Sequence, residues 1–384
     1  MRLGLITEDI DDANSGVATY ARSLAMALAG VAPGLPMTLI HRRDHEFYRG
    51  KDHLKLAPWG PHSDSSTRGS WNRLVRKQLL MPIMLRRKDF DLVHDTNHNA
   101  PFLLPSTYAR VVTLYDLIPL ILPEGLSRRR LEHLTLIRLI AMRADHIVTL
   151  SECSKRDIIR LYGIRPEQIT AISLAADERF RPATELEVEE ARRACKLTGK
   201  YVLHVGAFEP RKNLVTLVEA FRLAAPQLPD SSLVTIGRLR PGDQQRLQAL
   251  LPLNLQDRVK TLGFVEDQYL AGLYSGADAL VYPSSYEGFG LPVLEAMRCG
   301  TPVITSSVSS LPEVAGDAAL IVNPTDAGDI ARALIEIAAT HSVRANLRDA
   351  GLRRAALFSW EETARQTLAV YEEVSARKQT KRAG

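Results

Sequence analysis

Short apolar runs alternate along the chain with longer segments whose apolar residues recur at helical spacing. In the first half these runs are Arg2–Thr7, Met37–His41, Asp91–His94, Val111–Leu114, His146–Leu150 and Thr170–Leu174. In the second half they are Tyr201–Val205, Leu233–Ile236, Val259–Leu262, Ala279–Tyr282, Pro302–Thr305 and Ala319–Val322. Runs of this length are typical of buried strands, and strand–helix alternation favours parallel sheets with right-handed crossovers. Each half therefore predicts one doubly wound α/β domain.

The boundary between the two predicted domains lies near Asp177–Pro182, just before a polar, acid-rich helical stretch, Glu185–Arg193. The chain has 384 residues, of which 45% are hydrophobic and 24% charged, an ordinary globular composition whose length favours two domains over one. We expect an N-terminal domain over residues 1–178 and a C-terminal domain over residues 179–359.

The net charge and the cysteine content limit the cellular compartment and the kinds of binding partner that we expect. The net charge of +5 is a mild excess, compatible with an anionic ligand or a membrane surface and weak evidence for nucleic acid. Cys153, Cys195 and Cys299 form no C-x-x-C pair, which argues against a zinc site or a disulfide framework and favours reduced cysteines in the cytosol. Acidic residues follow Arg2–Thr7 at once, so no export signal is predicted, and no spanning helix is expected. These features predict a cytoplasmic protein, with peripheral contact at the inner face of a membrane as an option.

Basic residues are concentrated between Arg42 and Lys88, where they far outnumber acidic ones and are accompanied by Trp59 and Trp71. A solvated, loop-rich surface is one interpretation of this segment. The other is a patch for anionic lipid headgroups or for an anionic acceptor.

The segment Tyr282–Met297 carries the most informative pattern. An apolar strand leads into a loop with Gly288 and Gly290, and Pro292 suits the start of a helix. The N–H groups from about Gly290 to Val293 are then expected to be unpaired, and a helix N-terminus preceded by glycines is an anion site. Because open α/β sheets bind ligands at the carboxyl ends of their strands, this loop predicts a phosphate-binding site.

Glu287 and Glu295 flank this loop, the first within it and the second on the helix that follows. A phosphate would repel a carboxylate, whereas hydroxyls of a ribose or a transferred sugar can donate hydrogen bonds to it. A surface glutamate and a helix-stabilising glutamate are the alternative. The Gly-Phe-Gly-Leu-Pro frame between the two favours a nucleotide-sugar site.

A second pattern of the same kind occupies Leu203–Leu214. A strand leads into Gly206, then into Pro210 and a helical stretch that starts with Arg211 and Lys212. Cations oppose the dipole at a helix start unless an anion is present, so a bound diphosphate would make this arrangement favourable. A solvated basic pair is the alternative.

A third loop, Asp11–Ala18, links the first strand to the first helix. Gly16 would let the backbone come close to a ligand, and a simple tight turn explains the glycine equally well.

Together these stretches resemble the family 4 retaining glycosyltransferases, whose architecture of two Rossmann-like domains facing across a cleft is called GT-B. The likeness covers most of the chain and is densest over Val281–Pro324. The matching segments are Ser15–Val17, Thr149–Lys155, Val205–Asn213, Glu287 with Glu295, and Ser310–Val314.

The resemblance implies roles for these residues. Arg211 and Lys212 would neutralise the donor diphosphate, Glu287 would contact the donor sugar, and Glu295 the ribose. The backbone around Gly263–Val265 would meet the base. The implied donor-binding set is Gly16, Gly206, Arg211, Lys212, Gly263, Phe264, Val265, Glu287, Gly288, Phe289, Gly290, Leu291 and Glu295. The resemblance also implies that a C-terminal helix, about residues 360–380, returns to the acceptor-binding N-terminal domain.

One departure from the family pattern lies in Thr113–Pro119, where Tyr115 occupies the place of a histidine that relatives often carry near the reacting sugar. A phenol with a pKa of about 10 is a poor base at neutral pH, although it can donate a hydrogen bond. Tyr115, Asp116 and His94 form the predicted acceptor side, with Asp116 a candidate for orienting donor or acceptor. A structural polar role is the alternative for each.

The patterns and the family resemblance together imply a metal-independent hexosyltransferase that uses a nucleotide-diphosphate sugar, with Arg211, Lys212, Glu287 and Asp116 as its catalytic residues. Preorganised positive charge would stabilise the departing diphosphate, so no cofactor or divalent metal is expected, and no D-x-D motif is placed to bind one. The expected acceptor is a glycan or lipid-linked saccharide, and no nucleic acid partner is expected.

Likeness to bacterial mannosyltransferases of surface polysaccharide synthesis makes mannose from GDP-mannose the first expectation. An N-acetylhexosamine or glucose on a uridine carrier stays open. A nucleotide-sugar epimerase of the same architecture and a non-catalytic binding protein for nucleotide sugars or polyanions are the alternatives. A nicotinamide dehydrogenase is disfavoured, because no G-x-G-x-x-G follows the first strand.

Overall fold

The computed structural model describes residues 1–8, 16–41, 47, 55–58, 67–122, 127–238 and 242–383, which form two compact units. Unit 1 comprises Met1–Leu174 with Trp360–Gly384, and unit 2 comprises Ala175–Ser359. Each unit is a parallel sheet with helices on both faces, which confirms the predicted pair of doubly wound α/β folds. The chain leaves unit 1 four residues before the boundary that the sequence predicts at residue 178.

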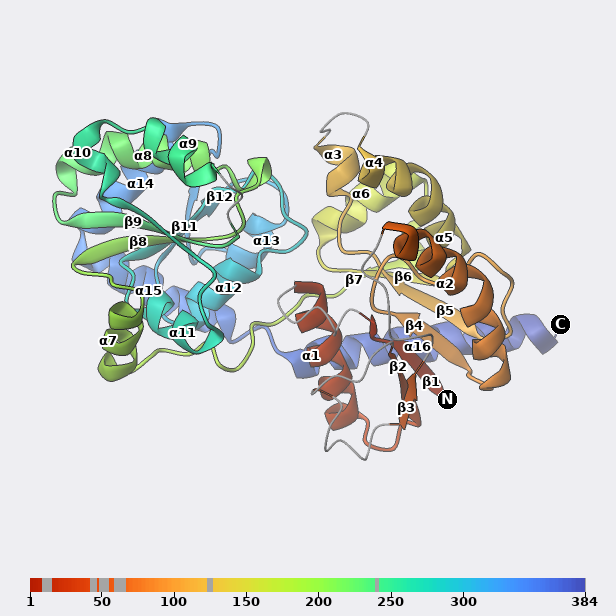
Figure 1. Cartoon of the computed structure of the whole chain (residues 1–384). Helices are drawn as coiled ribbons and strands as arrows, with labels where there is room; N and C mark the ends of the chain where they lie inside the picture. The colour runs from red at the N-terminus through yellow and green to blue at the C-terminus, as the bar shows by residue number, and fades with distance from the viewer. Residues whose placement is uncertain are drawn as a thin grey trace. The chain divides into compact units, whose positions relative to one another are not determined.

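Unit 1 is built on a seven-stranded sheet in the order β3-β2-β1-β4-β5-β6-β7. Its strands are β1 (Leu3–Ile6), β2 (Met37–His41), β3 (Lys55–Pro58), β4 (Leu92–Asp95), β5 (Ala109–Thr113), β6 (His146–Thr149) and β7 (Ile169–Ala171). Its helices are α1 (Gly16–Val31), α2 (Thr67–Arg87), α3 (Ile118–Ile121), α4 (Arg128–Glu132), the π-helix η3 (His133–Ile137), α5 (Arg138–Arg143), α6 (Glu152–Tyr162), the 3-10 turn η4 (Pro166–Gln168) and α16 (Trp360–Ala383). Right-handed crossovers place α1 and α16 on one face of this sheet and α2, α4, α5 and α6 on the other (Figure 1).

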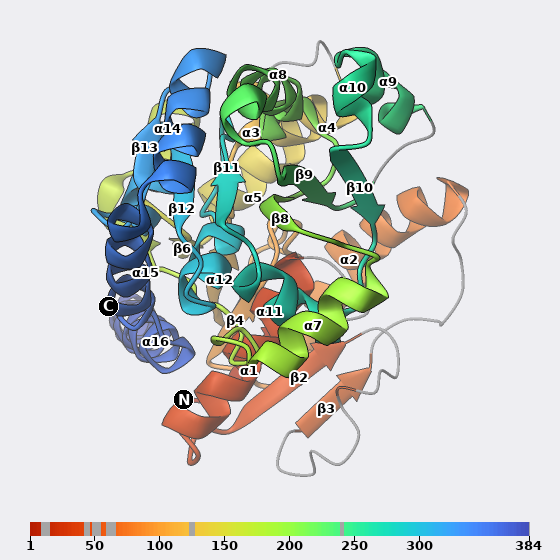
Figure 2. The ribbon, with the colours of Figure 1, turned by 90° about the vertical axis from the view of Figure 1, so that its left-hand side faces the viewer.

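Unit 2 is built on a six-stranded sheet in the order β10-β9-β8-β11-β12-β13. Its strands are β8 (Lys200–Val205), β9 (Ser231–Ile236), β10 (Val259–Gly263), β11 (Ala279–Tyr282), β12 (Val303–Ser306) and β13 (Leu320–Val322). Its helices are α7 (Glu185–Ala194), η5 (Pro210–Lys212), α8 (Leu214–Ala224), η6 (Ala225–Gln227), α9 (Asp243–Ala249), α10 (Leu253–Gln256), α11 (Asp267–Ser275), α12 (Leu291–Arg298), α13 (Leu311–Ala315), α14 (Ala327–Ala339) and α15 (His341–Ala355). Helices α8 and α14 pack together on one face, and α7, α11, α12 and α15 lie on the opposite face (Figure 2).

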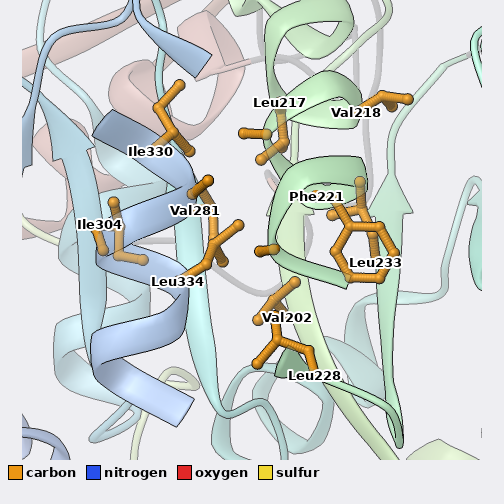
Figure 3. Packing of buried hydrophobic residues seen from close by; sticks show 14 of the residues in the cluster. Val202, Leu217, Val218, Phe221, Leu228, Leu233, Val281, Ile304, Ile330 and Leu334 are labelled. Atoms are coloured by element: carbon orange, nitrogen blue, oxygen red, sulfur yellow. The ribbon is translucent and has the colours of Figure 1, made fainter. Parts of the chain in front are cut away.

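The core of unit 2 forms between its sheet and the helices α8 and α14. Its buried apolar residues include Val202, Leu217, Val218, Phe221, Leu233, Val281, Ile304, Ile330 and Leu334 (Figure 3). Full burial of one such side chain contributes about 1.5–3 kcal/mol. This packing fixes the positions of β8 and β11, from whose carboxyl ends the candidate site is built.

The C-terminal helix α16 belongs to unit 1, where it packs against α1. Thr363 Oγ1 donates a hydrogen bond to the Ser173 carbonyl oxygen over 2.7 Å, and Tyr371 is fully buried. This is the segment that the resemblance assigns to the N-terminal domain. Within the described ranges, no helix is both long and apolar enough to span a bilayer.

Candidate functional site

Two loops leave adjacent strands of the second sheet at their carboxyl ends. Strands β8 and β11 pair directly. The loops that follow them are joined by hydrogen bonds: the Ser285 N–H donates to the Arg211 carbonyl oxygen over 2.8 Å, and Asn213 Nδ2 donates to the Pro283 carbonyl oxygen over 3.2 Å. The two strongest patterns in the sequence therefore meet at one edge of one sheet, where open α/β folds bind ligands.

Glu287 brings together the two predicted phosphate-binding cations. Its Oε2 lies 2.7 Å from Arg211 Nη1, and its Oε1 lies 2.7 Å from Lys212 Nζ. The Tyr282 hydroxyl donates to Glu287 Oε1 over 3.0 Å and also contacts Lys212 Nζ. Arg211 Nε donates in addition to Glu209 Oε2 over 2.8 Å. We name Arg211, Lys212, Tyr282 and Glu287 the ion cluster.

The two cations do not start a helix, contrary to the sequence prediction. Pro210–Lys212 is a 3-10 turn, Asn213 has a left-handed φ of 58°, and α8 starts only at Leu214. The Glu287 carboxylate also compensates their charges. The sequence pattern predicts two unpaired cations that oppose a helix dipole, and this prediction is therefore wrong. The cations do lie side by side at the carboxyl ends of the strands.

The ion cluster is buried except for the half-buried Arg211, and its electrostatics favour an ionised carboxylate. Burial alone would raise the pKa of Glu287, but the charges of Lys212 and Arg211 outweigh burial and hold that pKa below its ordinary value. Both Glu287 and Lys212 are buried. The ionised Glu287 therefore pairs with both cations, and Glu209, 2.8 Å from Arg211 Nε, compensates Arg211 further. Two carboxylates thus hold the two cations in place at the carboxyl ends of the strands.

Two glycines allow close packing beside the ion cluster, one against Lys212 and one against the backbone of the other glycine. A Cβ atom on Gly206 would lie 3.2 Å from Lys212 Cδ. Gly237 has a φ of 148°, and a Cβ atom there would lie 2.1 Å from the Gly206 carbonyl oxygen. Gly206 therefore accommodates Lys212, and its contact with a donor stays a prediction. The sequence patterns do not identify Gly237, because this glycine directly follows β9 and no recognisable motif surrounds it.

Serine side chains hold the loop that carries Glu287. Ser309 Oγ accepts a hydrogen bond from the Glu287 N–H over 3.0 Å. Ser310 Oγ lies within hydrogen-bond distance of the carbonyl oxygens of Glu287 and Phe289, at 2.9 and 2.7 Å. Ser310 lies in a segment that matches the family, whereas Ser309 is marked only by the serine-rich run after β12.

The helix after this loop, α12, has Gly290 as its N-cap, with a φ of 120° that other residues rarely adopt. The Val293 N–H donates to the Gly290 carbonyl oxygen over 3.0 Å, so the prediction of unpaired N–H groups is wrong for Val293. The Phe289 ring is buried and lies edge-on to Phe358, with centroids 6.1 Å apart. Phe289 could therefore reach a donor only through its backbone, and the predicted contacts of Gly288 and Leu291 stay predictions.

Glu295 lies on α12 next to a buried tyrosine. The Tyr274 hydroxyl donates to Glu295 Oε2 over 2.7 Å. Burial raises the pKa of Glu295 to about 7, and the hydrogen bond from Tyr274 acts in the opposite direction. The pKa of Tyr274 is itself raised by burial, by Glu295 and, more weakly, by Tyr282. Tyr274 therefore interacts directly with Glu295 and, through weaker electrostatics, with Tyr282 of the ion cluster.

We expect Glu295→Gln to stabilise the protein but weaken donor binding. The raised pKa means that the folded protein binds this proton more tightly than the unfolded chain, so stability is lost as pH rises from 4.5 towards about 7. Removing the charge should raise the free energy of unfolding by about 1 kcal/mol more at a pH of about 8 than at a pH of about 5 for this half-buried group, and the melting temperature should rise with it. Donor affinity should fall about ten-fold if Glu295 accepts hydrogen bonds from ribose hydroxyls.

Calorimetric melting at both pH values and titration with the donor measure the two effects of Glu295→Gln. The matched control is Glu313→Gln, another helical glutamate of unit 2, placed at the start of α13. A pH dependence of stability that is the same in Glu295→Gln as in the wild type would contradict the raised pKa.

The segment that the resemblance assigns to the base follows β10. Gly263 has a left-handed φ of 68°, and its carbonyl oxygen accepts the Gly237 N–H over 2.9 Å. Phe264 is exposed over 68% of its surface, whereas Val265 is buried. An exposed aromatic ring beside a turn suits stacking on a base. The contacts of these residues with a donor stay predictions.

In unit 1 the structure corrects the predicted role of His94. Its side chain is fully buried, with Nδ1 2.5 Å from the Tyr371 hydroxyl and Nε2 2.8 Å from Thr113 Oγ1. Burial lowers the pKa of His94 to about 3, so the ring is neutral. Both ring nitrogens join β4 to β5 and α16, and neither is available to an acceptor.

Tyr115 and Asp116 follow β5 and are half-buried. The Tyr115 hydroxyl donates to the Thr96 carbonyl oxygen, and Asp116 Oδ1 accepts from the Ile118 N–H over 2.9 Å. These bonds shape the loop, and contacts with a donor or acceptor stay predictions. Gly16 is the exposed first residue of α1, whereas residues 11–15 lie outside the described part of the chain.

Two tyrosines complete the site without having been marked by a motif. Tyr282 and Tyr274 each give a hydroxyl hydrogen bond to one of the two glutamates, Glu287 and Glu295 respectively. One signal was available for Tyr282, which ends an otherwise aliphatic strand immediately before the loop. A buried phenol needs a hydrogen-bond partner, and the following loop offers a carboxylate.

Comparison with known proteins extends over both units. Residues 15–175 match the family described as Glycosyl transferase 4-like domain, and residues 187–354 match the one described as Glycosyl transferases group 1. The chain is 29% identical over 388 residues to O-antigen chain mannosyltransferase B of Escherichia coli, covering 97% of this chain and 99% of that one. It is 31% identical over 312 residues to MMP alpha-(1->4)-mannosyltransferase of Mycolicibacterium hassiacum, covering 76% and 72%.

Solved structures show the same architecture. Sucrose-phosphate synthase from Thermosynechococcus elongatus superposes with a TM-score of 0.78 at 25% identity, covering 98% of this chain and all of that one. Anabaena HepE in complex with UDP-glucose superposes with a TM-score of 0.72 at 18% identity, covering 97% and 100%. The family matches fall on unit 1 and unit 2 in turn, and the likeness to O-antigen chain mannosyltransferase B spans nearly the whole chain. The chain therefore belongs to the glycosyltransferases of GT-B architecture, with a glycosyl transferase 4-like domain followed by a glycosyl transferases group 1 domain.

Proposed function

We propose that this glycosyltransferase moves mannose, with retention of the anomeric configuration, from GDP-mannose to a glycan or lipid-linked saccharide of a surface polysaccharide. The ion cluster carries the proposal, because it sets two cations and a buried carboxylate at the carboxyl ends of β8 and β11. The names of two relatives, O-antigen chain mannosyltransferase B and MMP alpha-(1->4)-mannosyltransferase, support mannose as the transferred sugar.

In the proposed reaction the bond between the sugar C1 and the diphosphate oxygen breaks as the acceptor hydroxyl oxygen bonds to C1 on the same face. The acceptor proton passes to the departing phosphate oxygen, so no side-chain base is required. Arg211 and Lys212 stabilise the negative charge that grows on the leaving diphosphate. Arg211 suits a forked grip on phosphate oxygens, and Lys212 acts as a point charge. Glu287 positions both cations and contacts hydroxyls of the donor sugar.

We further infer that these cations supply the counter-charge that a divalent metal supplies elsewhere, so the reaction needs no metal or other cofactor. A lipid-linked acceptor would be presented at the cytoplasmic surface of a membrane, where the enzyme would work as a peripheral protein.

A thermal-shift panel of nucleotide sugars tests the donor. A ligand at about 100 times its Kd stabilises the folded protein by about 2.7 kcal/mol, so GDP-mannose and GDP should raise the melting temperature. UDP-glucose and UDP-N-acetylglucosamine are the matched comparisons, since the HepE structure holds UDP-glucose. A shift confined to uridine nucleotides would overturn the guanosine assignment.

Product analysis by NMR, with and without a mannoside acceptor and with a chelator present, tests the reaction. We expect a new glycosidic bond of the donor's own anomeric configuration, formed only with acceptor and insensitive to the chelator. A change of the donor alone would favour the epimerase alternative. Donor binding without any product would favour the binding-protein alternative.

A further inference from the structure

One helical segment of unit 1 is apolar on two sides. The run from Arg128 to Arg143 passes continuously through α4, η3 and α5. Its inner side supplies Ile137 and Ile140 to the core of unit 1. A second set of apolar side chains is exposed to solvent: Leu131 (57% exposed), Leu134 (45%), Leu139 (41%) and Met142 (58%). The folding of unit 1 uses the inner side only, so the outer side is free for another surface.

The π-helical turn aligns the outer set. Leu131 and Leu134 are three residues apart, as are Leu139 and Met142, but Leu134 and Leu139 are five apart. Residues five apart do not share a side of an α-helix, whereas in a π-helix residue i bonds to residue i+5 and the two lie one above the other. The π-helix η3 therefore joins two short stripes into one. Single π turns inside α-helices are frequent at functional sites.

The second half of α2 enlarges this surface. Its exposed apolar side chains are Leu79, Leu80 and Ile83. Its buried side chains, Met81 and Leu85, belong to the same core cluster as the inner side of α5. Figure 1 shows α2 and α5 on the same face of the first sheet.

Hydrogen bonds place the ends of α2 and α5 against one short loop. Arg86 of α2 donates to the Pro105 carbonyl oxygen, and Arg143 of α5 donates to the Leu103 carbonyl oxygen. The two helices are therefore neighbours across this loop, and their exposed apolar side chains belong to one face of unit 1.

The same face is strongly basic. Its exposed cations are Arg76, Arg86, Arg87, Lys88, Arg129, Arg138 and Arg143. Glu132 is the one acidic residue of the sequence between residues 128 and 143, and none occurs between residues 76 and 88. Apolar side chains surrounded by arginines match the boundary of an anionic bilayer, where the former enter the headgroup layer and the latter bind lipid phosphates.

We propose that this surface, the basic apolar face formed by α2 and the segment 128–143, docks on a bilayer that contains anionic lipid. The proposal goes beyond sugar transfer, because it names the residues that hold the enzyme at a membrane. The surface shares Arg76, Arg86, Arg87 and Lys88 with the patch predicted at residues 42–88 and adds the segment 128–143. The part of that patch with Trp59 lies outside the described residues, and the side chain of Trp71 is not described.

Vesicle sedimentation of the full chain, without any nucleotide sugar, tests the docking. Wild type should bind vesicles of phosphatidylcholine with phosphatidylglycerol and should not bind pure phosphatidylcholine. One Arg near the surface contributes about five-fold in affinity, so Arg129→Gln with Arg138→Gln should weaken binding about 25-fold. Leu139→Ser with Met142→Ser should weaken it at least about ten-fold, because two apolar side chains no longer enter the bilayer.

The matched control is Leu186→Ser with Leu253→Ser, two leucines of unit 2 that are exposed by 69 and 85% and lie outside the basic apolar face. Vesicle binding should not change in this control, and all three double variants should keep the wild-type melting temperature. Equal binding to neutral vesicles, or unchanged binding of the two test variants, would overturn the proposal. So would a wild-type dimer that Leu139→Ser with Met142→Ser converts to monomers, because the face would then join two copies of the chain. The assay contains no donor, so its result is independent of the proposed sugar transfer.

Discussion

Replacing Lys212 with methionine is expected to lower kcat by about 100- to 1,000-fold, the usual cost of removing one preorganised group that stabilises transition-state charge. Lys212 Nζ lies 2.7 Å from Glu287 Oε1 and 4.7 Å from the centroid of the Tyr282 ring, so its position is set in advance. A preorganised cation needs no rearrangement as charge grows on the diphosphate, and its loss therefore acts mainly on the transition state. Methionine fills similar space and leaves Glu287 paired with Arg211, so the fold should persist.

Initial rates at saturating donor separate kcat from KM for Lys212→Met. Arg211→Lys is the companion variant, because it keeps the charge but loses the forked grip, and its kcat should lie between those of wild type and Arg211→Met. Arg222→Met, which breaks an exposed pair with Glu219, is the control and should behave as wild type. A Lys212→Met enzyme with unchanged kcat and only a raised donor KM would contradict the proposed stabilisation of the leaving group.

The strands of the fold could be predicted because buried parallel strands appear in the sequence as continuous apolar runs. Strands β2 and β11 have the predicted ends, and the other predicted strands lie within three residues of theirs. No such run marks β3, whose four residues, Lys55–Pro58, begin with a lysine and end with a proline. This strand exists because β2 offers it a partner at the edge of the sheet, where proline is tolerated.

The site could be predicted less completely, because loops follow from topology but charge pairs do not. Strand alternation places the loops after β8 and β11 at one edge of one sheet. The pairing of Lys212 with Glu287, 75 residues apart, depends on the 3-10 turn and the left-handed Asn213 that aim the lysine inward. Neither follows from local propensity. His94 shows the opposite case, since a polar residue near a strand end can serve the core as well as a ligand.

Replacing Glu287 with glutamine is expected to destabilise the protein by about 3–5 kcal/mol, because the change leaves Lys212 buried without a counter-ion. Glutamine keeps the size of the side chain and can still accept a hydrogen bond from Tyr282, so the loss reports the missing charge. Equilibrium unfolding in urea measures the effect. The control is Glu361→Gln, which breaks an exposed pair with Arg365 and should change stability by less than about 1 kcal/mol.

The pH dependence of Glu287→Gln then tests the cause of its instability. Burial lowers the pKa of Lys212, and in the wild type the charge of Glu287 partly offsets burial. Without Glu287 the pKa of Lys212 in the folded protein should fall further, so the folded protein binds fewer protons than the unfolded chain over a wider pH range. The stability of the variant should therefore recover as pH rises towards about 10. GDP should stabilise the variant more than the wild type, since a diphosphate would supply the missing negative charge. If Glu287→Gln unfolds at the wild-type urea concentration, then solvent already compensates Lys212, and the ion cluster cannot be the preorganised site of charge that sugar transfer requires.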